Sequence, residues 1–392
     1  MTNEEKFQLI TRNLEETLTE EELKKLIESE TPLRHYIGFE ISGKLHIGYL
    51  FQLMKVKDIQ DAGGETIIWL ADLHSAINDK LGGDLETIKR MANEYFIPAM
   101  ESLFESIGGD PKKLIFKLCS EEYAKHPEFW FTFLEMAKNT SLSRSKKSMT
   151  IMGREEAEDN METAKVMYPI MQAADIFLLQ TNIAHAGMDQ RKVHVIARES
   201  AFKIKTNALK DKNGNQIKPI AIHTPILLGL NLSKNFSDPT LEIQYTSGKV
   251  PEGTELNLDE IAMRLKMSKS KPGSGISIHD SKDEIFLKVN GAFAPPKQSE
   301  QNPILNWVRY LVFYDESAEF MVTEEEQHGG KKTIYKDYQS LEDDYKNGKL
   351  YPKPLKTALA EWLVEKLERV RQVFSDPIKR KALQEIEMIT VR

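Results

Sequence analysis

The sequence predicts an α/β fold in which a doubly wound parallel sheet is followed by a mostly helical C-terminal domain. Short apolar, β-favouring runs at 34–40, 66–71 and 113–118 alternate with helical periodicity. The run at 66–71 is almost continuously apolar, as expected of a strand covered by helices on both faces. From about residue 300 the alternation stops and only helical patterns remain. These observations indicate a Rossmann-like domain joined to a helical one.

In chain order, two short helices are expected first, the second capped by Thr19 and Glu22. The strand at 34–40 then leads into a helix that begins at His46 and ends before the two glycines at 63–64.

The start of this helix is suited to a phosphate, because its N–H groups are unpaired and its dipole is positive there. Gly48 lets a ligand approach the backbone closely, and His46 can donate to a phosphate oxygen. The alternative interpretation is an ordinary βα turn with a surface histidine.

Polar residues follow the strand at 66–71. Asp72 and His74 stand where that strand ends, which is where ligands sit in an open α/β sheet. A long amphipathic helix is expected over 85–107, and the strand at 113–118 follows it.

Residues 121–165 do not fit the alternation of strands and helices. They are helix-rich, partly basic and aromatic, with Phe129, Trp130, Phe131 and Phe133 in one short stretch. We expect a helical insertion that packs against a partner subunit, or covers the active site, or both.

The next helix carries a polar stripe. Tyr168, Gln172 and Asp175 fall at i, i+4 and i+7 and share one face of an otherwise apolar helix. Burying these groups is costly unless they find partners, and the alternative is a stripe that faces solvent. Asp189 is then expected at the N-cap of a helix that begins within 187–192.

A second motif, Lys266-Met-Ser-Lys-Ser270, lies far downstream. It follows a loop-rich connection over 203–265 that contains an Asn-Gly hairpin signal. Lys266 and Lys269 form a cationic pair suited to the charge that develops on a transferring phosphoryl group. The alternative is a solvated basic loop.

The last part of the chain is expected to be a separate helical domain. A helix capped by Ser281 and Glu284 opens it. Further helices are predicted at 303–314, 340–347 and 354–375, and from Asp376-Pro377 onward. The predicted domains are a catalytic domain over 1–245 with its insertion at 121–165, a linker with the lysine motif over 246–285, and a helical domain over 286–392.

Composition indicates a globular protein large enough for two domains, with 392 residues, 40% of them hydrophobic and 29% charged. No apolar run reaches membrane-spanning length, and the polar N-terminus does not resemble a signal peptide. The single cysteine, Cys119, excludes an internal disulfide framework, so we expect a cytoplasmic protein. The net charge of −7 argues against a generally basic nucleic-acid-coating protein but leaves RNA binding through local basic patches possible.

The two motifs, in this order, resemble the two signatures of class I aminoacyl-tRNA synthetases. The chain further resembles the archaeal/eukaryotic type of tyrosyl-tRNA synthetase over about residues 4–375. The motifs that carry this resemblance are Tyr36-Ile-Gly-Phe-Glu40, Leu70-Ala-Asp-Leu-His74, Tyr168-Pro-Ile-Met-Gln172 with Asp175, and Asp189-Gln-Arg-Lys192.

The resemblance implies a tyrosine-binding site. Tyr36 and Asp175 match the family's two contacts to the phenolic hydroxyl of the substrate, and Tyr168 and Gln172 match its ligands for the amino group. Gln190 belongs to the same set. A buried tyrosine–aspartate pair is chemically suited to this role, because the carboxylate can accept the phenol proton while the tyrosine donates.

The resemblance also implies an ATP site and a reaction in two steps. The carboxylate of tyrosine attacks the α-phosphate of ATP to give tyrosyl-adenylate, and the tyrosyl group then passes to the 3′ end of tRNA. The catalytic residues are matched by His46, Lys266 and Lys269, with Mg²⁺ carried by ATP. The ATP contacts are matched by Gly38, His46, Gly48, Asp189 and Lys269.

For tRNA, the family's contacts to the first base pair match Lys147 and Arg191. The resemblance further implies a homodimer and an anticodon-reading C-terminal domain. Three departures stand out, one of them a connection before Lys266 that is longer than in compact family members. The second histidine of the first signature is Tyr49 here, and the anticodon-reading positions are His328, Tyr351 and Pro354.

Two alternatives remain at this point. A tryptophanyl-tRNA synthetase shares both signatures, although it is not expected to keep the aspartate at 175. A non-catalytic, synthetase-derived RNA-binding protein would have no need of Tyr168, Gln172 and Asp175 together with both lysines.

Overall fold

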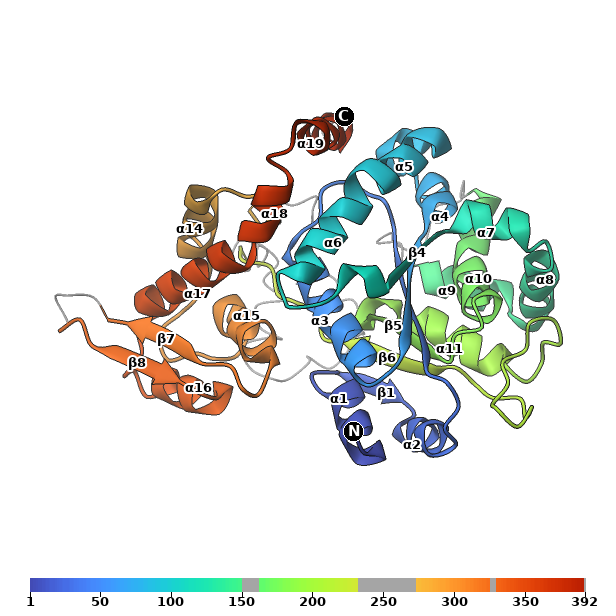
Figure 1. Ribbon diagram of the computed structural model, residues 1–392, viewed down its shortest axis with the longest axis horizontal. Helices are drawn as coiled ribbons and strands as arrows, with labels where there is room; N and C mark the ends of the chain where they lie inside the picture. The colour runs from blue at the N-terminus through green and yellow to red at the C-terminus, as the bar shows by residue number, and fades with distance from the viewer. Residues whose placement is uncertain (150–161, 232–272, 325–328, 391–392) are drawn as a thin grey trace, which may run out of the picture. The chain divides into compact units, whose positions relative to one another are not determined.

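The computed structural model describes residues 1–149, 162–231, 273–324 and 329–390. The chain forms two compact units (Figure 1). The first comprises Met1–Lys44, Gln52–Pro225 and Gln372–Arg392, and the second comprises Leu45–Phe51 and Ile226–Arg371.

A six-stranded sheet organises the first unit, with the strand order β1-β6-β5-β2-β3-β4. Its strands are β1 (Glu16–Leu18), β2 (Arg34–Phe39), β3 (Glu65–Leu70), β4 (Leu114–Leu118), β5 (Ile183–Gly187) and β6 (Ile220–Thr224). All neighbouring pairs are parallel except β1 and β6, which are antiparallel at one edge. The predicted doubly wound sheet is confirmed, with an antiparallel strand added at its edge.

The order of the strands reverses beside β2, since β3 and β4 continue on one side of it and β5 and β6 on the other. In Figure 1, α6 (Ile97–Glu105) lies on one side of the sheet, and α10 (Thr163–Leu178) and α11 (Arg191–Ser200) lie on the other. Ligands of open α/β sheets bind at the carboxyl ends of the strands where such a reversal occurs. This point lies between the ends of β2 and β5.

The first unit contains further helices, among them the two short ones predicted at the N-terminus and those predicted within 121–165. The helix predicted from Asp376-Pro377 in the C-terminal domain belongs to the first unit instead. These further helices are α1 (Asn3–Thr11), α2 (Glu20–Glu28), α3 (Ile47–Asp61), whose first residues belong to the second unit, α4 (Asp72–Ile77), α5 (Leu85–Met91), α7 (Cys119–Lys125), α8 (Phe129–Asn139), α9 (Leu142–Ser148) and α19 (Pro377–Thr390). None of the helices in the described part of the chain is long and apolar enough to cross a membrane.

The single helix predicted over 85–107 is interrupted. α5 and α6 are joined by a π-helical turn, Ala92–Phe96, and a proline stands in the first turn of α6. Pro98 has no N–H to donate and its ring excludes the carbonyl one turn earlier, so the regular hydrogen-bond ladder cannot continue through this point.

The second unit is mostly helical, as predicted. It contains α14 (Lys282–Asn290), α15 (Pro303–Tyr310), α16 (Tyr338–Lys346) and α17 (Pro352–Lys366), and α18 (Glu368–Val373) lies at its boundary with the first unit. A hairpin of β7 (Phe320–Thr323) and β8 (Lys332–Tyr335) was not predicted. The capping box of Ser281 and Glu284 is present at the start of α14.

The compact units have other bounds than the predicted functional domains. Residues 372–392 belong to the first unit, where Arg90 forms two hydrogen bonds with Glu385 at 2.6 and 2.7 Å and Lys44 contacts Glu387 at 2.8 Å. The boundaries at 245 and 286, and the functions assigned to them, stay predictions.

Candidate functional site

Aromatic side chains from several elements of the first unit enclose one carboxylate. β2 contributes Tyr36, β3 contributes Trp69, α7 contributes Tyr123, and α10 contributes Tyr168 together with Asp175. The four aromatic residues belong to one buried apolar cluster. The polar stripe predicted on α10 is therefore buried, and the solvent-facing alternative is wrong for Tyr168 and Asp175.

Asp175 is 1% exposed and accepts hydrogen bonds on both carboxylate oxygens. Nε1–H of Trp69 donates to Oδ2 at 2.9 Å, and the hydroxyl of Tyr123 donates to Oδ1 at 2.5 Å. Nε2 of His74 lies 3.5 Å from Oδ2. Burial raises the pKa of the Asp175 carboxyl well above its usual range, and the hydrogen bonds from Tyr123 and Trp69 act against this rise.

Tyr36 is 2% exposed and lies in the same cluster. Burial, with the negative charge of Asp175 as a second cause, raises the pKa of its hydroxyl. The hydroxyl therefore keeps its proton at neutral pH and can donate. A Cβ added to Gly38 would lie 3.6 Å from this hydroxyl and 3.6 Å from Cδ1 of Trp69, so Gly38 borders the same cluster.

The hydroxyl of Tyr168 donates to Oε1 of Glu40 at 2.7 Å. Nδ2 of Asn78 donates to the same oxygen at 2.9 Å, and Nζ of Lys80 lies 3.8 Å from Oε2. Burial raises the pKa of the Tyr168 hydroxyl, and the charge of Glu40 raises it further. A carboxylate therefore stands beside the tyrosine that the resemblance assigns to the substrate's amino group.

The two predicted glutamines contact each other. Nε2 of Gln172 donates to Oε1 of Gln190 at 3.1 Å, and Nε2 of Gln190 donates to Oδ2 of Asp189 at 3.1 Å. Oε1 of Gln172 is buried and has no hydrogen-bond partner among the described residues. A buried acceptor of this kind is costly unless a ligand satisfies it, which indicates a donor group on the ligand.

Asp72 and His74 belong to α4, and His74 lies beside Asp175. Oδ1 of Asp72 accepts from Sγ of Cys119 at 2.8 Å and from the N–H of Ser120 at 2.9 Å, which joins the ends of β3 and β4. The ring of His74 meets that of Tyr168 edge-on at 4.9 Å. Burial lowers the pKa of His74 to about 4, so the ring is neutral at pH 7.

Asp189 lies just beyond β5, at the reversal of strand order. The prediction that it caps a helix is wrong, because α11 begins after Gln190 and no side-chain cap is formed. Its carboxylate instead approaches Gly187, where an added Cβ would fall 2.5 Å from Oδ1. The carboxylate can take this place because position 187 is a glycine.

The first signature lies in the second unit. His46 pairs with Ser277 in an antiparallel bridge, and its Nδ1 accepts from the N–H of Gly48 at 3.1 Å. In the neutral ring the proton is then on Nε2, which makes that atom the donor. The ring of Tyr49 stands edge-on to His46 at 5.0 Å. Tyr49, at the predicted position of a second histidine, thus orients the first one.

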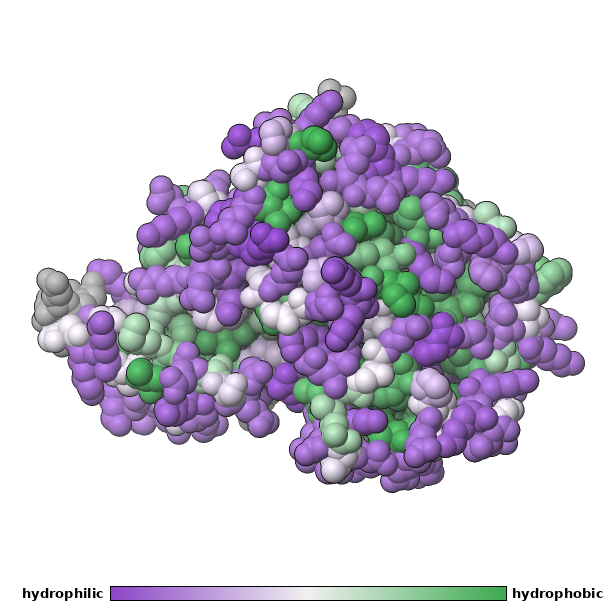
Figure 2. Space-filling model, viewed as in Figure 1, coloured by the Kyte–Doolittle hydropathy of each residue, from purple (hydrophilic) through white to green (hydrophobic). Residues whose placement is uncertain are grey.

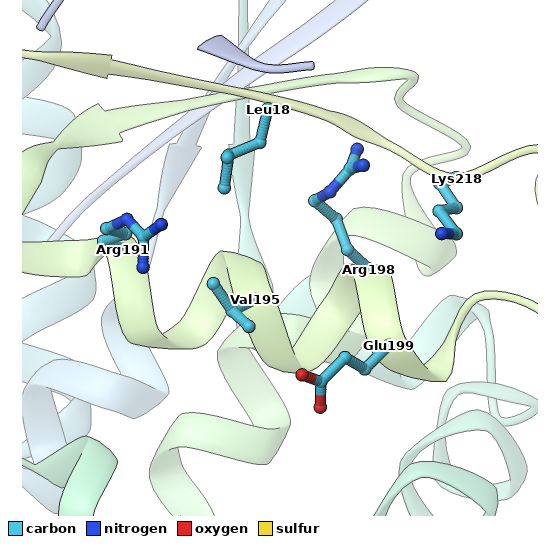
Figure 3. A pocket seen from close by; sticks show the side chains of 6 residues that line it. All are labelled: Leu18, Arg191, Val195, Arg198, Glu199 and Lys218. Carbon is cyan, nitrogen blue, oxygen red and sulfur yellow. The ribbon is translucent and has the colours of Figure 1, made fainter. Parts of the chain in front are cut away.

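The predicted tRNA residue Arg191 lines a cavity of about 290 Å³ (Figure 3). Its guanidinium donates twice to Oε1 of Glu16 on β1, at 2.8 and 3.0 Å. Arg198, also in the cavity wall, donates to the carbonyl of Pro219 and to Glu22. The cavity is lined by Leu18, Arg191, Val195, Arg198, Glu199 and Lys218.

The other predicted residues are placed as follows. Lys147 is in the last turn of α9, Tyr351 is exposed at the N-cap of α17, and Pro354 is buried in the first turn of that helix. Lys266, Lys269 and His328 lie outside the described residues.

Sequence reasoning missed three polar neighbours of the pocket: Glu40, Trp69 and Tyr123. Glu40 ends one of the quoted motifs, so its place after a strand was an available signal. Trp69 and Tyr123 gave no signal in the sequence, because an aromatic residue in an apolar run predicts only core packing.

Comparisons with known proteins identify the family. A family model described as tRNA synthetases class I (W and Y) matches residues 28–247 and 249–368. A tyrosine–tRNA ligase of Pyrococcus furiosus is 46% identical over 376 residues, which cover 95% of this chain and 96% of the relative. One of Pyrobaculum arsenaticum is 40% identical over 394 residues and covers 100% of both chains.

Solved structures give the same result. A crystal structure of tyrosyl-tRNA synthetase complexed with L-tyrosine from Pyrococcus horikoshii matches with a TM-score of 0.88 and 43% identity, covering 98% of this chain and 100% of that one. The tryptophan-specific and non-catalytic alternatives are not favoured by these relatives. The chain therefore belongs to the class I tRNA synthetases and, among them, to the family of tyrosine–tRNA ligases.

Proposed function

We propose that the pocket around Asp175 binds L-tyrosine through its phenolic hydroxyl. The observation that supports this most directly is a buried carboxylate with two donors already in place and a buried, protonated Tyr36 in the same cluster. A carboxylate has about four acceptor positions, so two remain for further donors. A ligand hydroxyl can donate to Asp175 while it accepts from Tyr36, which is a pairing that phenylalanine cannot supply.

The α-amino group of tyrosine is held at the other end of the pocket. The buried Oε1 of Gln172 supplies an acceptor for it. Tyr168 and Gln190 complete the set, and Glu40, which accepts from Tyr168, adds a negative charge that favours an ammonium group.

The reaction needs no general base, because the carboxylate of tyrosine is already a nucleophile toward the α-phosphate of ATP. Positioning and electrostatic stabilisation of the phosphates supply the acceleration. Gly38 and Asp189 contact the nucleoside part of ATP, while His46 and Gly48 contact its phosphates. Lys266 and Lys269 stabilise the departing pyrophosphate, and Mg²⁺ enters with ATP as part of the substrate.

The tyrosyl group is then transferred to the 3′ end of tRNA. Lys147 and Arg191 contact the first base pair, and residues 286–392 read the anticodon. Pro354 cannot accept a hydrogen bond from a guanine through a side chain, so anticodon reading here uses other groups than the family's aspartate. The enzyme works in the cytoplasm.

The enzyme also acts as a homodimer through α8. On this helix Trp130, Phe131 and Leu134 are 44%, 64% and 60% exposed. So much exposed apolar surface on one short helix supports a protein–protein contact there. Figure 2 shows apolar side chains at the right-hand edge, where Figure 1 places α8.

Equilibrium binding of L-tyrosine tests the tyrosine site. Isothermal titration of the wild type with tyrosine and with phenylalanine should show tight binding of tyrosine alone. The Asp175→Ala variant should bind both weakly and about equally, because it removes the acceptor that distinguishes them. Unchanged binding of tyrosine by this variant would place the site elsewhere.

A further inference from the structure

Two donors reach Asp175 from elements far apart in the sequence. Trp69 lies on β3, 106 residues before Asp175, and its indole N–H donates to Oδ2 at 2.9 Å. Tyr123 lies on α7, and its hydroxyl donates to Oδ1 at 2.5 Å. An indole N–H can only donate, so Oδ2 carries no proton toward Trp69. Each carboxylate oxygen therefore has a protein donor of its own.

The Tyr123 ring is itself held firmly. It stacks on Phe129 with ring centroids 3.8 Å apart and planes inclined by 14°. The rings of Trp69 and Trp130 each have their centroids 6.0 Å from that of Tyr123. The hydroxyl of Tyr123 thus has little freedom to move away from Asp175.

Fixing both oxygens has a geometric consequence. The terminal torsion of an aspartate is broad, so a carboxylate held at one oxygen can still turn about the Cβ–Cγ bond. A donor on each oxygen, from two different elements, fixes the carboxylate plane and hence the directions of the remaining lone pairs. Recognition of one hydroxyl depends on those directions, since a hydrogen bond weakens steeply when it is misaligned.

We propose that Trp69 and Tyr123 are positioning residues for phenol recognition. They hold the Asp175 carboxylate in the orientation in which its free lone pairs meet the hydroxyl of the substrate, and they thereby set the discrimination between tyrosine and phenylalanine. This inference rests on the proposed tyrosine site. It adds two residues that contact Asp175, the aspartate proposed to bind the substrate hydroxyl. Neither residue takes part in the chemical step.

The other polar groups around Asp175 do not replace these donors. His74 is 3.5 Å away, beyond a good hydrogen bond, and Asp72 adds a like charge. Cys119 donates to Asp72 and not to Asp175. Tyr36 belongs to the substrate contact itself.

The test uses Tyr123→Phe and Trp69→Phe, assayed by amino-acid-dependent ATP–pyrophosphate exchange. Each variant removes one donor and keeps an aromatic ring. Because the carboxylate can then turn, its hydrogen bond with the substrate hydroxyl is misaligned and weakened, and the KM for tyrosine should rise about tenfold or more in each variant. The KM for ATP should stay within about twofold of the wild type, as neither residue is among the proposed ATP contacts. The ratio of kcat/KM for tyrosine over phenylalanine should fall by a similar factor.

A pH profile separates positioning from general destabilisation. Each donor favours the ionised form of Asp175, so its removal raises the pKa of that carboxyl further. The acid limb of kcat/KM for tyrosine should therefore move to higher pH in both variants. A loss of folded protein would instead lower kcat for all substrates equally and leave the limb in place.

Matched controls are available in the second unit. Tyr345→Phe removes a buried tyrosine hydroxyl that donates to the carbonyl of Pro295, and Trp307→Phe removes an indole N–H that donates to the carbonyl of Leu228. Both should leave the KM for tyrosine and the preference over phenylalanine unchanged.

The outcomes are distinguishable. One outcome overturns the positioning role only. In it, the wild type shows exchange with tyrosine, and Tyr123→Phe and Trp69→Phe keep the wild-type KM for tyrosine and the wild-type preference for tyrosine over phenylalanine. Absence of tyrosine-dependent exchange in the wild type would overturn the proposed function. Should Trp69→Phe fold poorly, Tyr123→Phe alone decides, since it deletes one oxygen and keeps the ring stacked on Phe129.

Discussion

At the scale of single residues, Asp175 shows how a buried charge becomes selective. Removing a carboxylate from water costs several kcal/mol unless hydrogen bonds replace the lost hydration. Trp69 and Tyr123 supply two of these bonds. In the proposed site the hydroxyl of the substrate supplies another. A ligand without a hydroxyl leaves that position unfilled, at a cost of about 1–3 kcal/mol or more.

Substitutions at residues 175 and 269 should have separate effects. Asp175→Ala should raise the KM for tyrosine by about tenfold to a hundredfold and abolish its preference over phenylalanine. Lys269→Ala should mainly lower kcat for adenylate formation, by about a hundredfold, because in the proposed mechanism its charge acts as the phosphates separate. Steady-state exchange kinetics measure both parameters. Equal losses in KM and kcat for the two variants would contradict the separate roles.

The predictability of the site also differs from residue to residue. Tyr168, Gln172 and Asp175 could be found because three polar residues at helical spacing interrupt an apolar helix. Trp69 and Tyr123 could not, because their role depends on hydrogen bonds to a residue 106 and 52 positions away. Nothing local to either residue distinguishes a donor to a carboxylate from a packed aromatic ring.

At the scale of elements, β2, β3 and β4 were predictable and β5 and β6 were not. The first three are short runs rich in β-branched and aromatic residues. β5 and β6 each place a histidine, His185 and His223, in the buried interior of the sheet. A histidine within a short run of alanine, glycine and threonine indicates a loop as readily as a strand, so tertiary packing decides the outcome.

The exposed face of α8 yields a prediction about assembly. Phe131→Glu or Leu134→Glu should shift the protein from dimer to monomer, because a charge would be buried without a partner in the proposed interface. Sedimentation velocity at micromolar concentration measures this. Leu287→Glu, on α14, is the control, since Leu287 is also strongly exposed but lies far along the chain in the second unit. A Phe131→Glu protein that stays dimeric would exclude α8 as the contact.

At the scale of the whole molecule, the first unit holds a cluster of buried histidines. His194 Nδ1 lies 3.0 Å from Nε2 of His223, and the rings of His35 and His185 are 5.3 Å apart. All four side chains are buried. Burial lowers the pKa of His35 to about 3 and that of His223 to about 4, and it lowers the pKa of His185 and His194 well below the usual value.

This cluster should make the first unit sensitive to acid. An unfolded histidine has a pKa of about 6.5, so between that value and the lowered folded pKa the unfolded state binds more protons. The stabilisation of the folded state by the neutral, buried histidines is fully present above a pH of about 6.5. It is lost as the pH falls, by up to about 1.4 kcal/mol per pH unit for each histidine. The raised pKa of Asp175 acts in the opposite direction, but for one group only.

Urea unfolding between pH 7.5 and 4.5 measures this dependence. The free energy of unfolding should fall steeply below pH 6.5, and the slope should be smaller in His223→Gln, which removes one titrating group from the cluster. A slope that is the same in the variant and in the wild type would contradict the role given to His223.

The boundaries of the compact units could not be read from the sequence, because the chain crosses between them more than once. Residues 45–51 belong to the second unit, and residues 372–392 return to the first. The return depends on ion pairs such as Arg90 with Glu385, which join positions 295 residues apart. The periodicity of α19 predicts a helix but does not identify the surface on which it packs.

Amino-acid-dependent ATP–pyrophosphate exchange with the wild-type chain measures which amino acid the enzyme activates. The assay is run with tyrosine, phenylalanine or tryptophan at equal concentrations and without tRNA, so that the amino acid is the only variable. We expect exchange with tyrosine and none above background with phenylalanine or tryptophan. Exchange with tryptophan but not with tyrosine would contradict this expectation.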